Sequence, residues 1–348
     1  MELLLKSGAH PNICFATGSL PLAVACIFKN ENMVKLLLNK HSNVNTVTNI
    51  GDICNTLYQC DEAVDIIEIV AYKRFDTPEF AISALHIASI FNNGNIVKML
   101  LDNKTRINLK CSVNPVMLYI LANNCKNANR PEIAMNNYSN CSIIHEVPPL
   151  HIACLMGNDD IVEMLLQSNI ANLSDYIDSP ILINAEQVIC IHGLLVDFDL
   201  NSGEKQTFML SRLQIACFST HWTILKTLLK HGASIFETCR ISDTILAGFS
   251  RNMKELQNRD IDGTVYKTSV EMFLFENNHI SIIRDLKQLG ICFEPKNIHK
   301  LFKKFVESCI LGDIQTIRAL LVIIEDTSII YQNNPQFTMH ARLTKQRL

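Results

Sequence analysis

Histidines and cysteines at recurring positions are the residues of this chain whose types could do chemistry. His86 and His151 each precede an Ile-Ala pair, and either imidazole could serve as a metal ligand or a general base. A cysteine follows an alanine at Cys26, Cys154 and Cys217, where a thiolate could act as a nucleophile. The sequence contains no His-x-x-x-His and no Cys-x-x-Cys pair, so zinc-ligand spacing is missing. A nucleophile is needed once, whereas these cysteines recur in register, which favours a packing role.

Motifs for other chemistry are also missing from the sequence. It has no Gly-x-x-x-x-Gly-Lys phosphate loop, no Gly-x-Gly-x-x-Gly and no Gly-x-Ser-x-Gly. The acidic pair Asp159 and Asp160 precedes an apolar helical stretch, and acidic residues stabilise a helix N-terminus. We therefore expect no catalytic, cofactor-binding or metal-binding residues, and no enzymatic activity.

The recurring positions belong to longer segments that align without gaps. In each, an apolar stretch of seven residues leads, after seven more, into a second apolar stretch of five. The four pairs are Leu20–Cys26 with Val34–Leu38, Ser83–Ser89 with Val97–Leu101, Pro148–Cys154 with Val162–Leu166, and Ser211–Cys217 with Leu225–Leu229.

Each segment predicts two short helices joined by a turn. Proline near the start of the first stretch suits a helix N-terminus, and the alanine allows close approach of a neighbouring helix. The second stretch repeats apolar residues at helical spacing, as in Ile224, Leu225, Leu228 and Leu229. A glycine such as Gly232 then ends it.

These segments resemble the ankyrin repeat. Leu150–Cys154 followed by Ile161–Leu166 carries the resemblance most clearly, and Gly8–Asn12, His41–Asn45 and Gly232–Phe236 resemble the loop that ends such a repeat. The resemblance implies an all-α repeat fold, an ankyrin-repeat solenoid of helix-turn-helix units with short β-hairpin loops. It also implies that the imidazoles of His86 and His151 hydrogen-bond neighbouring backbone and connect adjacent repeats.

The spacing of the clear segments predicts the domain organisation. Equivalent leucines at positions 22, 85, 150 and 213 are 63, 65 and 63 residues apart, about twice the ~33-residue ankyrin period. We therefore expect one degenerate repeat after each clear one, and a truncated N-terminal unit, since Met1–Leu5 aligns with a second helix. The expected division is ankyrin repeats over 1–238 with clear units near 19–47, 83–109, 148–173 and 211–237, an insertion or degenerate repeat over 239–268, divergent repeats over 269–325, and a disordered polar tail over 326–348.

Composition limits the partners and the compartment. The formal net charge of −3 gives no broad basic surface for nucleic acid. No apolar run reaches the ~18 residues that a membrane span needs. The odd number of scattered cysteines suits a reducing compartment, so we expect a cytoplasmic, or alternatively nuclear, protein. We also expect a monomer.

A repeat stack would bind proteins through the residues that packing leaves free, at the end of the first helix and in the following turn. The candidates are Phe28, Lys29, Phe91, Asn92, Asn93, Leu155, Met156, Phe218, His221 and Trp222. Trp222 is the only tryptophan, and tryptophan is enriched at interface hot spots. Phe91 or Phe218 could instead cover the joint between two repeats.

The leading functional hypothesis is a non-catalytic protein-interaction module or scaffold that uses its concave face and hairpin tips. One alternative is a substrate-recognition adaptor of a ubiquitin ligase, although the sequence after the last repeat has a lone Pro335 rather than a Leu-Pro-rich segment. Another is the cytosolic ankyrin region of a larger channel or kinase.

Overall fold

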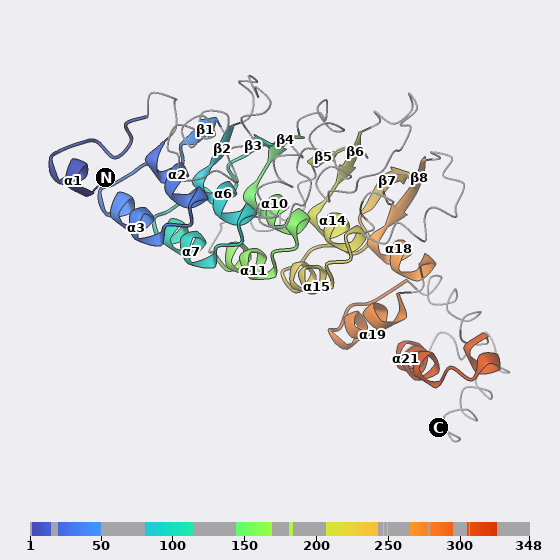
Figure 1. The fold of residues 1–348 in the computed structure, drawn as a ribbon. Helices are drawn as coiled ribbons and strands as arrows, with labels where there is room; N and C mark the ends of the chain where they lie inside the picture. Colours follow the sequence, from blue (N-terminus) through green and yellow to red (C-terminus); the bar gives the residue numbers. More distant parts are fainter. Residues whose placement is uncertain are drawn as a thin grey trace, which may run out of the picture. The chain divides into compact units, whose positions relative to one another are not determined.

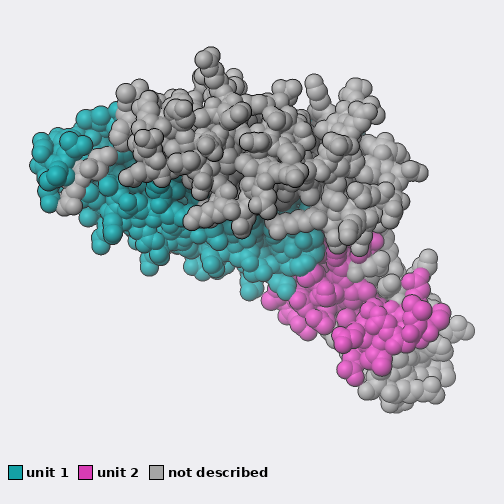
Figure 2. All heavy atoms as spheres, viewed as in Figure 1, with its two compact units in different colours: residues 1–234, 239–266 teal, residues 235–238, 267–348 magenta. Residues whose placement is uncertain are grey.

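The computed structural model has two compact units, and the residues that it describes fall in both. Unit 1 comprises residues 1–234 and 239–266, and unit 2 comprises residues 235–238 and 267–348 (Figure 2). The described residues are 2–14, 20–49, 81–113, 144–168, 181–183, 207–242, 246, 249, 265–277, 279–294, 305 and 307–325.

Unit 1 contains four described helix pairs of nearly constant length, preceded by the short α1 (Glu2–Lys6). The first helix of a pair has seven or eight residues and the second has nine, as the aligned segments predict. The pairs are α2 (Pro21–Ile27) with α3 (Glu31–Asn39), α6 (Ala84–Ile90) with α7 (Gly94–Asp102), α10 (Pro149–Met156) with α11 (Asp159–Gln167), and α14 (Arg212–Phe218) with α15 (Trp222–Lys230).

Local sequence explains where these helices begin. Ser83 and Ser211 each cap a first helix by accepting a hydrogen bond from the backbone amide three residues later. Gln214 completes a capping box with Ser211. Pro21 and Pro149 each occupy the first position of a first helix, where no backbone donor is needed.

The four pairs stack directly on one another. First helices contact in the order α2, α6, α10, α14, and second helices contact in the order α3, α7, α11, α15 (Figure 1). Because consecutive clear repeats touch along both rows, no repeat separates them in the stack. The prediction of a degenerate repeat after each clear repeat is therefore wrong.

Paired strands account for the long spacing instead. Short antiparallel strands join consecutive helix pairs, and in each of three hairpins the two strands are far apart in the sequence. They are β1 (Val47–Asn49) with β2 (Ala81–Ser83), β3 (Cys111–Val113) with β4 (Ile144–Val147), and β5 (Ile181–Ile183) with β6 (Phe208–Leu210). The intervals of 63 and 65 residues thus consist of one repeat plus an insertion between its two strands.

Unit 2 contains a further helix pair with the lengths found in unit 1. Ser269 caps α18 (Val270–Glu276), and α19 (Ile280–Gln288) follows after a short turn and contacts α21 (Ile314–Glu325). The division between the units passes through β7 (Thr238–Ser242) and β8 (Val265–Ser269). The expected polar tail, 326–348, and most of the expected insertion, 239–268, lie outside the described residues.

Candidate functional site

The turns between the two helices of each repeat share one backbone geometry. In unit 1 a residue with positive φ follows each first helix closely: Lys29 at 52°, Asn92 at 50°, Gly157 at 74° and Thr220 at 58°. The next amide then donates to a carbonyl five residues back, at 3.0 Å from Asn30, 3.1 Å from Asn93, 3.0 Å from Asn158 and 2.8 Å from His221. These bonds hold all four turns in the same conformation.

Side chains at the starts of the second helices add further bonds. Asn30 and Asn93 accept hydrogen bonds from the amides of Met33 and Ile96, which caps α3 and α7. Asn158, at the equivalent place in the third repeat, donates from Nδ2 to the carbonyl oxygen of Ser89 at 2.6 Å. The third turn is thereby bonded to the second repeat.

Consecutive turns also touch through side chains. The ammonium group of Lys29 lies 5.2 Å from the centre of the Phe91 ring, a cation–π contact between the first and second repeats. The His221 ring lies against Gly157, between the third and fourth repeats. We call the surface formed by these turns the turn row, and its residues are Phe28, Lys29, Asn92, Asn93, Met156, Gly157, His221 and Trp222.

The contact between His221 and Gly157 leaves no room for a side chain at position 157. A Cβ built on Gly157 would lie 2.6 Å from His221 Cε1, and its φ of +74° disfavours any other residue. Gly157→Ala should therefore lower the free energy of unfolding by about 2 kcal/mol, of which about 1 kcal/mol is backbone strain. Gly232→Ala is the matched control, because Gly232 has a φ of +94° and nothing within 4 Å. Equal losses in urea denaturation of the two variants would contradict the contact.

Three predicted binding residues are buried, which corrects their assignment to an exposed surface. Phe91 is 8% exposed, Leu155 0% and Phe218 2%. Phe218 packs against Phe249 with ring centres 6.0 Å apart. Such side chains fill joints within the stack, as the alternative interpretation of Phe91 and Phe218 stated, and they offer a partner almost no surface.

The remaining seven predicted residues are exposed or partly exposed, and the structure places them all in the turn row. Phe28 is 45% exposed, an unusual value for a phenylalanine at the end of a helix whose other apolar residues are largely buried. Lys29 and Asn92 are exposed, whereas Asn93, Met156, His221 and Trp222 are half-buried. The insertions at the predicted hairpin tips, 50–80, 114–143 and 184–206, lie outside the described residues.

His86 and His151, whose imidazoles could serve as metal ligands or general bases, instead connect adjacent repeats. His86 Nε2 donates to the carbonyl oxygen of Val147 in the next repeat at 2.9 Å, so Nδ1 accepts from the Ser83 hydroxyl at 2.6 Å. Burial lowers the pKa of His86 to about 4, although the bond to Val147 opposes the shift. His151 Nδ1 accepts from Arg212 Nε of the next repeat at 3.2 Å.

The recurring cysteines lie in the core. Cys26, Cys154 and Cys217 are all fully buried. Burial raises the pKa of Cys26 and Cys154 to about 12, with the Arg212 charge opposing the shift at Cys154. Burial also raises the pKa of Cys217 well above its ordinary value. Protonated, enclosed thiols are poor nucleophiles, so these residues act as small apolar side chains.

The described part of the chain offers no site for metal chemistry and no membrane-crossing helix. Within it, no three His, Cys, Asp or Glu side chains gather closely enough to hold a metal ion. None of the helices in the same residues combines the length and the apolar character that a bilayer crossing requires.

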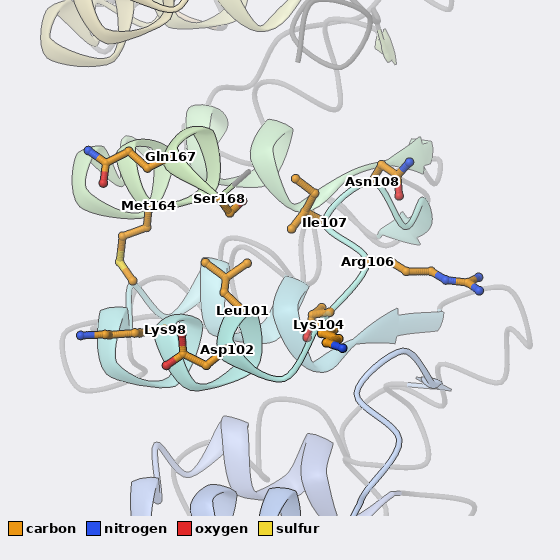
Figure 3. Close-up of a pocket in the computed structure, with 11 residues that line it drawn as sticks. Lys98, Leu101, Asp102, Lys104, Arg106, Ile107, Asn108, Met164, Gln167 and Ser168 are labelled. Atoms are coloured by element: carbon orange, nitrogen blue, oxygen red, sulfur yellow. The ribbon is translucent and has the colours of Figure 1, made fainter. Parts of the chain in front are cut away.

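A groove that the sequence did not indicate lies between α7 and α11. It has a volume of about 850 Å³ and is lined by residues of both helices and of the loop after α7 (Figure 3). Ser168, which ends α11 in an extended conformation, is one of the lining residues.

Comparison with known proteins agrees with this architecture. The family model described as ankyrin repeats (3 copies) matches residues 1–111 and 82–176, which together span half of the chain. No curated protein matches the chain significantly. Beyond residue 176, α14 and α15 have the same helix lengths as the matched repeats. The turn between them has the same backbone hydrogen bond, from the His221 amide to a carbonyl five residues back. The chain belongs to the ankyrin-repeat family.

Proposed function

We propose that the chain is a non-catalytic protein-binding module whose contact surface is the turn row. Ankyrin repeats are generally protein–protein interaction modules. Here His86 and His151 hydrogen-bond adjacent repeats, and the recurring cysteines are buried in the core. The observation that carries the choice of surface is the shared turn geometry, which presents side chains on four backbones that are already fixed.

Fixed turns favour binding because little conformational entropy is lost when a partner docks. The row offers an exposed aromatic side chain at Phe28, a cation at Lys29, amides at Asn92 and Asn93, and a tryptophan at Trp222. Aromatic side chains with polar neighbours are typical of the residues that contribute most to protein interfaces.

Trp222→Ala tests this surface at its only tryptophan. We expect the variant to weaken partner binding by about 2 kcal/mol, as truncation of a hot-spot residue does. The thermal midpoint should change little, since the Trp222 side chain is half-buried and lies at the start of α15. The partner is first isolated with the full chain as bait and identified by mass spectrometry, and affinities are then measured by calorimetry.

Phe218→Ala supplies the matched comparison within the same repeat. Its ring is 2% exposed and packs on Phe249, so its loss should lower the thermal midpoint and leave the affinity of the folded fraction intact. A Trp222→Ala protein that is destabilised but binds with unchanged affinity would remove Trp222 from the contact surface.

A further inference from the structure

Loops that follow the second helices form a ladder of asparagine hydrogen bonds. Asn12 Oδ1 accepts from the amide of Asn43 in the next loop at 2.8 Å. Asn45 Oδ1 accepts from the amide of Arg106 in the loop after that at 2.7 Å. Each asparagine occupies the same place in its loop, four residues after the residue with positive φ at Gly8 or His41.

Asn108 is the next asparagine of this ladder, four residues after Lys104 with its φ of 59°. Its side chain is exposed and has no hydrogen-bond partner within the part of the chain that the structure describes. The amide acceptor that binds the following loop in the two preceding steps is therefore available at the edge of the groove.

The end of α11 differs in conformation from the ends of the other second helices in unit 1. Three second helices end in a helical-type residue with ψ near zero: Lys40 at 18°, Asn103 at 24° and His231 at 11°. Ser168, which ends α11, is extended with ψ of 112°. The groove lies beside Ser168, α7 and the loop after α7.

The lining of the groove combines apolar and positively charged side chains. Leu101, Ile107 and Met164 point into the space between the two helices, and Lys98 and Arg106 extend at opposite ends of it (Figure 3). Lys104 is the third cation of the lining.

Acidic groups near the groove do not cancel these charges. Asp102 is the one carboxylate among the described lining residues. The neighbouring Glu163 accepts a hydrogen bond from Gln167 at 2.6 Å and lies 4.0 Å from the His231 imidazole. The groove therefore has an excess of positive charge around an apolar centre, although the whole chain is slightly acidic.

We propose that this groove binds an extended acidic segment of a partner protein. A backbone amide of the segment donates to Asn108 Oδ1, replacing the bond that a following loop makes in the ladder. An apolar side chain packs on Leu101 and Met164, and flanking carboxylates face Lys98, Lys104 and Arg106. The groove is formed by second helices and a loop, so it is a surface separate from the turn row and independent of it.

A labelled synthetic peptide tests the proposal on the full chain. The probe carries one leucine flanked on both sides by glutamates, and its binding is followed by fluorescence anisotropy. We expect saturable binding that weakens as salt is added, because exposed charges are screened. A peptide with glutamines in place of the glutamates, and a peptide with serine in place of the leucine, should each bind at least about tenfold more weakly.

Charge reversal within the groove locates the site. The double variant Lys104→Glu, Arg106→Glu should raise the dissociation constant about tenfold or more. The Arg106 bond to Asn45 uses its backbone amide, so the substitution leaves the ladder in place. Lys35→Glu, Lys40→Glu is the matched control, because both lysines are exposed and lie outside the groove, Lys35 on α3 and Lys40 at its C-cap.

One further variant and three possible results test whether the groove binds an acidic segment. Asn108→Ala should weaken the peptide about fivefold without lowering the thermal midpoint. The proposal is overturned if the wild-type chain does not bind the peptide, or if the groove and control double variants weaken it equally. Tighter binding of a single-stranded oligonucleotide than of the peptide would also overturn it.

Discussion

Arginine in place of Ala153 should unfold the centre of the repeat stack. The Ala153 side chain is 0% exposed in α10, which contacts both α6 and α14. A guanidinium group there would be buried, and the described residues of α6, α10 and α14 include no buried carboxylate to pair with it. Arg212 already donates to the neighbouring His151. We expect a loss of about 4 kcal/mol or more in the free energy of unfolding, measured by urea denaturation.

Gln167→Arg is the control for the added charge. Gln167 is the exposed last residue of α11. A basic side chain is favourable at this position because it lies at the helix C-terminus. Its effect should stay within about 0.5 kcal/mol. Because a repeat contacts only its neighbours, limited proteolysis of Ala153→Arg should cut first near α6, α10 and α14. Wild-type stability of Ala153→Arg would contradict the close packing of these three helices.

Acidification should destabilise the protein through His86. The pKa of the buried imidazole is lowered from 6.5 to about 4, chiefly because burial disfavours its charged form. Between these values the unfolded chain binds a proton that the native protein excludes. The contribution of His86 is therefore complete above about pH 6.5 and is lost as the pH falls towards about 4, by up to about 3 kcal/mol.

His86→Gln isolates this contribution, since glutamine can donate to Val147 but does not titrate in this range. We expect the variant to be less stable than the wild type at about pH 7, because the substitution disturbs the hydrogen bonds that His86 makes with Ser83 and Val147. The difference between its unfolding free energies at about pH 7 and about pH 4 should be smaller than in the wild type by about 2 kcal/mol. Identical pH dependence in both proteins would mean that His86 is not buried in its neutral form.

Features that depend on neighbouring residues were predictable from the sequence. The apolar stretches marked both helices of each clear repeat, and Ser83, Ser211, Pro21 and Pro149 marked where first helices begin. The recurrence of Cys26 in register indicated a packed position, and its thiol is buried. These signals are local because helix periodicity and capping involve residues only a few positions apart.

Local patterns could not show whether each interval between clear repeats contains two repeats or one repeat with an insertion. A spacing of 63 or 65 residues fits two repeats as well as it fits one repeat with an insertion. Only the direct contacts between α6 and α10, and the pairing of β3 with β4 across 114–143, distinguish these possibilities. Strand pairing at such a separation depends on partners that no local pattern specifies.

The sequence by itself determined that this protein is a stack of helix pairs, and which short stretches form them. Tertiary structure alone decided which residues at the ends of first helices remain exposed. Phe28 lies two residues after Cys26 and Phe218 lies one residue after the aligned Cys217, yet Phe28 is 45% exposed and Phe218 is 2% exposed. It also decided that Ser168 leaves α11 in an extended conformation beside a groove. The physical reason is that burial and grooves depend on what packs from elsewhere in the chain, as Phe249 packs on Phe218, whereas periodicity reports only one helix at a time.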